Sequence, residues 1–125
     1  MAEVLIDTNV LSRVFTGDKA VKEFIENLDA AVCMVVYIEC LQGSKSNREK
    51  RIVESYLSRF ELHHVDSSIS SRTIELIRTY SNTHGLFLAD ALIAATCLEH
   101  DLTLVTYNIK DFTFIGGLKH LAPTV

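Results

Sequence analysis

Four acidic residues, far apart in the chain, occupy positions from which their carboxylates could meet. Asp7 and Asp111 each follow a short apolar run, Glu39 comes soon after another, and Asp90 interrupts an apolar segment. Converging carboxylates repel one another and raise one another's pKa, so such a cluster is stable mainly around a cation. Because all the ligands would be oxygens, the four residues indicate a site for Mg²⁺ or Mn²⁺.

Asp90 is the most informative of the four acids, because its neighbours in the sequence are apolar. An ionised carboxylate among such side chains is costly to bury unless a cation or hydrogen-bond donors compensate it. A divalent metal can compensate the charge, activate a water and stabilise the charge that develops on a phosphodiester. The apolar neighbours are Leu86, Phe87, Leu88, Leu92 and Ile93.

Each acid also has a purely structural explanation. Asp7 and Asp90 could cap the N-terminus of a helix, and Glu39 could form a surface ion pair. Asp111 could be a cap or a solvent-exposed acid. The occurrence of all four in one order favours a shared site over four separate accidents.

The elements that would position these acids alternate between strands and helices. Short apolar runs predict strands at residues 4–6, 31–36, 62–65, 102–105 and 118–121. Helical spacing predicts helices at 10–15, 19–28, 37–41, 47–60 and 87–100, and another that Asp66, Ser67 or Ser68 caps and that ends at His84. This order predicts an α/β fold with a mainly parallel central sheet of four to five strands flanked by helices. Such sheets bind ligands at the carboxyl ends of their strands, which is where three of the acids fall.

The composition fits one domain over residues 1–125. The chain is 48% hydrophobic and 22% charged, with Pro123 as its only proline. The first apolar run is cut by Asp7, which argues against a signal peptide, and no run approaches the roughly 20 apolar residues of a membrane span. Cys33, Cys40 and Cys97 show no metal-ligand spacing, and we expect reduced, buried thiols in a cytoplasmic protein.

Four segments resemble the motifs of PIN domains. They are VLIDTNV at residues 4–10, YIEC at 37–40, LADALIAAT at 88–96 and TYNIKDF at 106–112. Each motif is weak alone, but their order and spacing cover essentially the whole chain. At this length the chain is most similar to the VapC-type toxins of type II toxin-antitoxin systems.

The resemblance implies a Mg²⁺- or Mn²⁺-dependent endoribonuclease that hydrolyses tRNA or other structured RNA with a metal-activated water. Such toxins form homodimers, and the C-terminal segment of a small antitoxin lies over their active-site groove. Carried over by position, Asp7, Glu39 and Asp90 become catalytic metal ligands. Asp111 or Asn108 fills the fourth place.

Other polar residues could assist such a site. Thr8 and Asn9 are close enough to Asp7 to support its carboxylate, or they could simply cap the first helix. A basic group could contact the RNA backbone, or it could be a solvated helix face. Its members are Lys45, Arg48, Lys50 and Arg51.

Three positions depart from the family pattern. Ala89 stands where relatives often have proline, Tyr107 where many have a basic residue, and Asn108 where many have the fourth acid. The net charge of −4 is also unusual for a nucleic-acid binder, although leaving out the four candidate acids brings it to zero. A non-catalytic PIN-like module that binds RNA or protein is therefore the alternative.

Two other enzyme classes place acids at strand ends. A haloacid-dehalogenase-like phosphatase needs a second Asp two residues after its nucleophile, where this chain has Asn9. A phospho-acceptor receiver domain needs paired acids ahead of the acceptor strand, and the chain has none there. Both classes fit the sequence less well than a metal-dependent nuclease.

Overall fold

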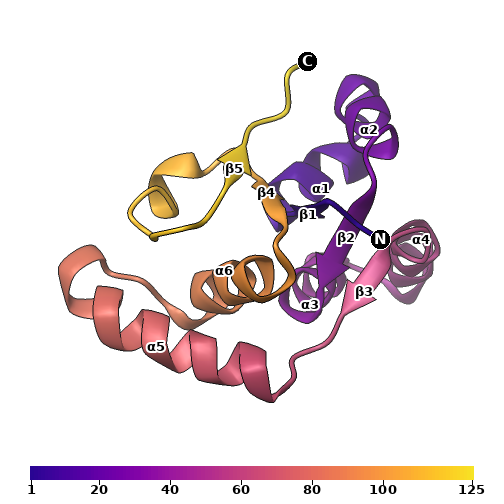
Figure 1. Ribbon diagram of the computed structural model, residues 1–125. Helices are drawn as coiled ribbons and strands as arrows, with labels where there is room; N and C mark the ends of the chain where they lie inside the picture. Colours follow the sequence, from indigo (N-terminus) through magenta and orange to yellow (C-terminus); the bar gives the residue numbers. More distant parts are fainter.

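The computed structural model describes residues 1–125 and contains one five-stranded sheet (Figure 1). All neighbouring strands are parallel, in the order β3-β2-β1-β4-β5. The parallel α/β sheet predicted from the alternation of elements is therefore confirmed. Its strands are β1 (Val4–Ile6), β2 (Ala30–Cys33), β3 (Glu61–His63), β4 (Thr103–Val105) and β5 (His120–Leu121).

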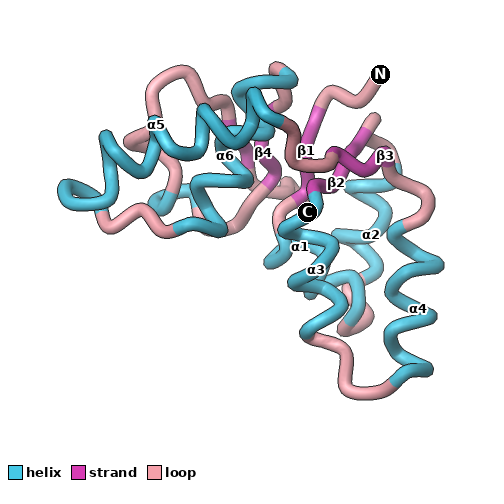
Figure 2. Tube along the Cα trace, turned by 90° about the horizontal axis from the view of Figure 1, so that it is seen from below, coloured by secondary structure: helices cyan, strands magenta, loops and turns pink.

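Helices connect the strands and cover the sheet. Figure 2 shows α3 and α4 projecting from the sheet as a hairpin, on the opposite side of the molecule from α5. The helices are α1 (Thr8–Phe15), α2 (Lys19–Glu26), α3 (Met34–Gln42), α4 (Asn47–Leu57), α5 (Ser67–His84) and α6 (Leu88–His100), with a short 3₁₀ helix η1 (Ile109–Asp111) before β5. None of these helices combines the length and the apolar character that a membrane crossing requires.

The core lies around β1 and α6. The three residues of β1 are buried, as a central parallel strand with both faces covered requires. Helix α6 is buried over Ala91 and Ile93–Cys97, where small side chains allow close approach to the sheet. The three cysteines are free and buried, as predicted. Strand β1 is therefore the central strand of the sheet, and Asp7 follows directly at its carboxyl end.

Several predicted boundaries are wrong by a few residues. The largest error concerns residues 34–36, which were expected in the second strand but begin α3. The β-branched Val35 and Val36 favour a strand locally, whereas Val36 is buried in this structure as a helical residue. Strand β3 is likewise shifted, from residues 62–65 to Glu61–His63. Neither shift changes which acids follow β1 and β4.

Candidate active site

Asp7 lies at the junction of β1 and α1. It is the N-cap of α1, and its Oδ1 accepts a hydrogen bond from the backbone N–H of Thr8 at 2.8 Å. The residue is only 5% exposed. Burial raises the pKa of its carboxyl, hydrogen bonds from Thr106 and Thr8 lower this pKa, and the charge of Glu39 raises it. Asp7 therefore does cap α1, as its structural explanation expected. Its carboxylate is also buried at the carboxyl end of β1.

Thr106, the residue after β4, holds Asp7 from the other side. Its hydroxyl donates to Asp7 Oδ2 at 2.8 Å and accepts from Asn9 Nδ2 at 3.1 Å and from the backbone N–H of Asn108 at 3.0 Å. This uses the full hydrogen-bonding capacity of the hydroxyl. Asn9 also donates to Asp7 Oδ2 at 3.2 Å, and its Oδ1 accepts from the backbone N–H of Tyr107 at 3.1 Å. The ends of β1 and β4 are therefore joined around one carboxylate.

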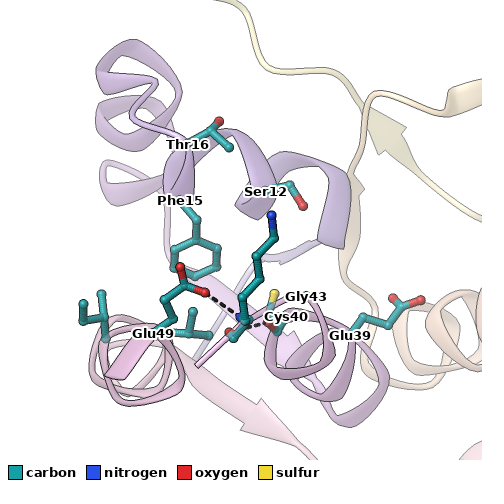
Figure 3. Close-up of a pocket in the computed structure, with 11 residues that line it drawn as sticks. Ser12, Phe15, Thr16, Glu39, Cys40, Gly43 and Glu49 are labelled. Atoms are coloured by element: carbon teal, nitrogen blue, oxygen red, sulfur yellow. Dashed lines mark hydrogen bonds between the residues drawn. The ribbon is translucent and has the colours of Figure 1, made fainter. Parts of the chain in front are cut away.

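Glu39 reaches the same region from the second turn of α3. The hydroxyl of Thr8 donates to Glu39 Oε1 at 2.6 Å, so Thr8 contacts Asp7 through its backbone and Glu39 through its side chain. Figure 3 shows the Glu39 carboxylate pointing away from Cys40 and Gly43, its neighbours on the same helix. Thr8 therefore links two of the predicted acids.

Asp90 lies in the first turn of α6. Burial raises the pKa of its carboxyl to about 6, and the charges of Asp7, Asp111 and Glu39 each add to the rise. The sequence argument for this burial is partly wrong, because the preceding Phe87 is 80% exposed. The charges of the other three predicted acids all act on Asp90, which places the four carboxylates in one region.

The remaining acid, Asp111, is exposed at the end of η1. Asn108, the alternative for the fourth position, is exposed as well, and only its backbone N–H joins the Thr106 network. Asp111 carries a charge that is felt at Asp90, whereas a neutral amide has none to contribute. The electrostatics therefore favour Asp111 over Asn108.

None of the four acids has a basic partner. The ion pairs of the structure involve other carboxylates, and no Lys, Arg or His lies within ion-pairing distance of Asp7, Glu39, Asp90 or Asp111. No three His, Cys, Asp or Glu side chains lie close enough together in the structure to hold a metal ion. The donors nevertheless fit a hard divalent cation, because they are carboxylate oxygens whose ionised form is disfavoured at Asp7 and Asp90.

The four predicted basic residues do not form one surface. Lys50 Nζ donates to the backbone carbonyl of Ser44 at 3.3 Å, and Lys45 lines a groove beside Glu39. Arg48 and Arg51 line a separate, open hollow along α4. This basic group is therefore divided between two surfaces.

The groove beside Glu39 runs between α1, α3 and α4 (Figure 3). Its volume is about 420 Å³, and it combines apolar and polar lining. The residues that line it include Phe15, Cys40, Lys45, Glu49, Ile52 and Val53. Glu39 is the one residue of the acidic cluster that borders the groove, and its carboxylate points away from the groove.

Sequence reasoning missed Thr106 as a member of the site. Its side chain is completely buried and makes three hydrogen bonds at the site, as many as the predicted supporting residue Asn9. The available signal was its position, since Thr106 follows β4 as Asp7 follows β1. Neighbouring parallel strands end at the same edge, so residues in these two positions meet.

Comparison with known proteins supports the same assignment. A model of the PIN domain matches residues 4–115. Ribonuclease VapC1 of Rickettsia felis is 30% identical over 128 residues, covering 94% of each chain, and Ribonuclease VapC10 of Mycobacterium tuberculosis is 29% identical over 121 residues, covering 93% of this chain and 90% of its own. A chain in a toxin-antitoxin complex from Klebsiella pneumoniae has a TM-score of 0.82 at 30% identity, with 98% of each chain covered. With the parallel sheet and the acids at its edge, this match shows that the chain belongs to the PIN-domain family.

Proposed function

We propose that this protein is a metal-dependent endoribonuclease and the toxin of a toxin-antitoxin pair that acts in the cytoplasm. The observation that carries the proposal is the group of four acids without basic partners at one edge of the sheet. Uncompensated carboxylates that raise one another's pKa destabilise a fold, so their presence indicates a cation that binds during function. The relatives named ribonucleases supply the reaction class.

In this proposal Asp7, Glu39, Asp90 and Asp111 hold Mg²⁺ or Mn²⁺. The bound metal supplies Lewis-acid stabilisation of the phosphoryl oxygens and lowers the pKa of an attacking water. The chain's own contribution is orientation, because Thr106 and Asn9 fix one oxygen of Asp7 while Thr8 joins Asp7 to Glu39. In this proposal the acids act on a single RNA phosphate from four places in the chain, which are the β1–α1 junction, α3, α6 and η1.

The decisive experiment is cleavage of labelled total tRNA by the purified protein in Mg²⁺, in Mn²⁺ and in EDTA. We expect cleavage with either metal, none in EDTA, and a loss of at least about 100-fold in Asp7→Asn and Asp90→Asn. Asp29→Asn is the matched control, since this exposed acid lies away from the site. Equal cleavage by the site variants would reveal a contaminant, and binding without cleavage would favour the non-catalytic module.

The groove beside Glu39 suits a segment of an antitoxin. The Klebsiella relative was solved as a toxin-antitoxin complex. Ile52 is 55% exposed in the wall of the groove, where a partner side chain would cover it. An antitoxin segment seated there would contact the helix that carries Glu39, at one border of the acidic cluster.

Coexpression with the product of a neighbouring short reading frame tests this partner. We expect the two chains to copurify and the antitoxin to suppress cleavage. Ile52→Asp would abolish copurification and keep the nuclease active, whereas Ile74→Asp, an equally exposed position on α5, would change neither. An inhibited Ile52→Asp complex would place the antitoxin elsewhere.

We also propose a homodimer. Phe87 and Leu88 are 80% and 64% exposed at the start of α6, and adjacent exposed apolar side chains favour contact with another chain. Light scattering should give twice the monomer mass for the wild type and the monomer mass for Phe87→Glu. A monomeric wild type would refute the dimer without affecting the nuclease.

A further inference from the structure

Arg13 is held over an aromatic ring that is attached to the acidic site. Its guanidinium carbon lies 4.3 Å from the centroid of the Tyr107 ring. The backbone N–H of Tyr107 donates to Asn9 Oδ1, and Asn9 Nδ2 donates to Asp7. A continuous set of contacts therefore connects the guanidinium with a candidate metal ligand.

The charge of Arg13 is not used by a close carboxylate. Its nearest acidic partner is Asp18, at 4.0 Å, and the Arg13 side chain is 55% exposed. Arg59 and Arg72 differ, because each makes an ion pair at 2.9 Å or less. Arg13 thus keeps free N–H donors on a guanidinium whose position the ring restricts.

Tyr107 contacts Arg13 with the face of its ring, and its hydroxyl takes no part in this contact. The hydroxyl oxygen is buried and has no hydrogen-bond partner, which is unusual for a tyrosine. A buried phenol without a partner contributes nothing that phenylalanine would lack. What the ring contributes is a flat surface under Arg13.

A phosphate of the substrate is the ligand that this arrangement fits. The four acids and the net charge of −4 oppose the approach of an RNA backbone, and a positive side chain near the acidic edge favours it. Arg13 is six residues beyond Asp7, which corresponds to about 9 Å along α1. A planar guanidinium binds a phosphate through two parallel hydrogen bonds.

We propose that Arg13 binds a backbone phosphate of the RNA strand next to the acidic cluster and that Tyr107 positions Arg13 for this contact. The proposal rests on the proposed ribonuclease function and deepens it. The proposal assigns the phosphate contact to Arg13, which is connected to the site, instead of to the basic group around α4, which is divided between two surfaces. Arg13 and Tyr107 act on substrate binding, and no step of hydrolysis depends on them.

The test measures binding of a short fluorescein-labelled single-stranded RNA in Mn²⁺, with Asp90→Asn as the parent chain so that the RNA stays intact. KCl is varied between about 50 and 200 mM. We expect Arg13→Gln to weaken binding about 10-fold and to reduce the slope of log affinity against log salt by about 0.7, the value for one phosphate contact on a single strand. Arg78→Gln, an exposed arginine on α5, is the control with the same change of charge.

Two Tyr107 variants separate positioning from folding. Tyr107→Leu keeps the charge of Arg13, so binding should weaken several-fold while the salt slope stays close to that of the parent. Tyr107→Phe should restore parental binding, because the hydroxyl has no partner. Melting temperatures of the variants establish that they are folded.

The outcomes distinguish this proposal from the proposed function. If Arg13→Gln and Arg78→Gln have the same affinity and salt slope, Arg13 makes no phosphate contact, although the chain can still be a nuclease. If the unsubstituted protein cleaves RNA and only Arg13→Gln raises KM, both proposals stand. A protein that neither binds nor cleaves RNA would overturn both.

Discussion

Thr106 and Asn9 fix the orientation of the most buried acid in the site. Both side chains donate to the same oxygen of Asp7, and its other oxygen accepts one hydrogen bond, from the backbone N–H of Thr8. A carboxylate that is held in this way loses little conformational entropy when it binds a ligand. At this scale the hydrogen bonds explain how the fold tolerates a buried carboxylate.

Replacing Thr106 tests this network. Thr106→Val removes the donor from Asp7 and an acceptor from Asn9, and we expect a loss of about 1–3 kcal/mol in the free energy of unfolding. We also expect cleavage to fall at least about 10-fold, as for loss of a residue that orients a metal ligand. Thr106→Ser keeps the hydroxyl and should restore both properties. Urea titration and tRNA cleavage provide the measurements, and an active, stable Thr106→Val would show that Asp7 needs no support.

The acids at strand ends were predictable, and the side chains between them were not. Asp7 and Asp90 are recognisable because a charge interrupts an apolar run. Thr106 is uncharged and follows an ordinary strand, so its role depends on the pairing of β1 with β4, which involves residues about a hundred positions apart. A single sequence reports local pattern and is silent about such distant contacts.

Most helices of this fold begin or end at residues that cap their backbone groups. Asp7, Asp18, Ser46 and Asp66 each cap a helix through a side-chain hydrogen bond. Two of the helices end at glycine, α3 at Gly43 and α5 at Gly85. Caps were largely predictable from residue type, whereas the start of α3 was not, because Cys33 caps it without a side-chain hydrogen bond.

The two glycines should respond oppositely to alanine. Gly85 has φ of 68°, a left-handed conformation, and Gly85→Ala should destabilise the protein by about 1 kcal/mol. No atom lies within 4 Å of the added Cβ, so backbone strain alone is measured. Gly43 has φ of −73° and ordinary contacts, and Gly43→Ala should stabilise by about 0.5 kcal/mol. Chemical denaturation checks both, and a stabilising Gly85→Ala would contradict the expected strain.

The contact between β3 and the end of α6 predicts a pH dependence. The His63 ring lies 4.1 Å from the His100 ring, and burial, followed by the proximity of His100, lowers the pKa of His63 below its ordinary 6.5. The folded state therefore prefers neutral His63. Its contribution to stability is complete above pH 6.5 and is lost as the pH falls below that value towards the lowered pKa.

Comparison with His63→Phe isolates this contribution from the titration of the acids. The free energy of unfolding of the wild type should fall more steeply between pH 7 and 5 than that of the variant, which keeps an aromatic ring beside His100. Denaturant titrations at several pH values measure the difference. Parallel curves would mean that His63 is accommodated equally well in both protonation states.

At the scale of the whole molecule, the acidic edge opposes stability in the absence of metal. Because the pKa of Asp90 is raised to about 6, its ionised form at pH 8 destabilises the folded state. Asp90→Asn should therefore be more stable than the wild type in EDTA, by about 1 kcal/mol after allowance for solvent screening. Asp29→Asn should leave stability unchanged.

Added metal should make the wild type more stable than Asp90→Asn. Added Mn²⁺ is expected to raise the melting temperature of the wild type more than that of Asp90→Asn, since a ligand that binds only the folded state stabilises it by mass action. Calorimetry in EDTA and in MnCl₂ gives both values. A wild type that is more stable than Asp90→Asn in EDTA would show that the carboxylate is already compensated without a metal.

The central position of β1 has a consequence for synthesis of the protein on the ribosome. Residues 4–6 emerge first, yet β1 must wait for β4, at residues 103–105, before both of its edges are paired. Thr106 reaches Asp7 only at that stage. A nascent chain that ends before residue 106 therefore carries Asp7 without the hydroxyl that orients its carboxylate.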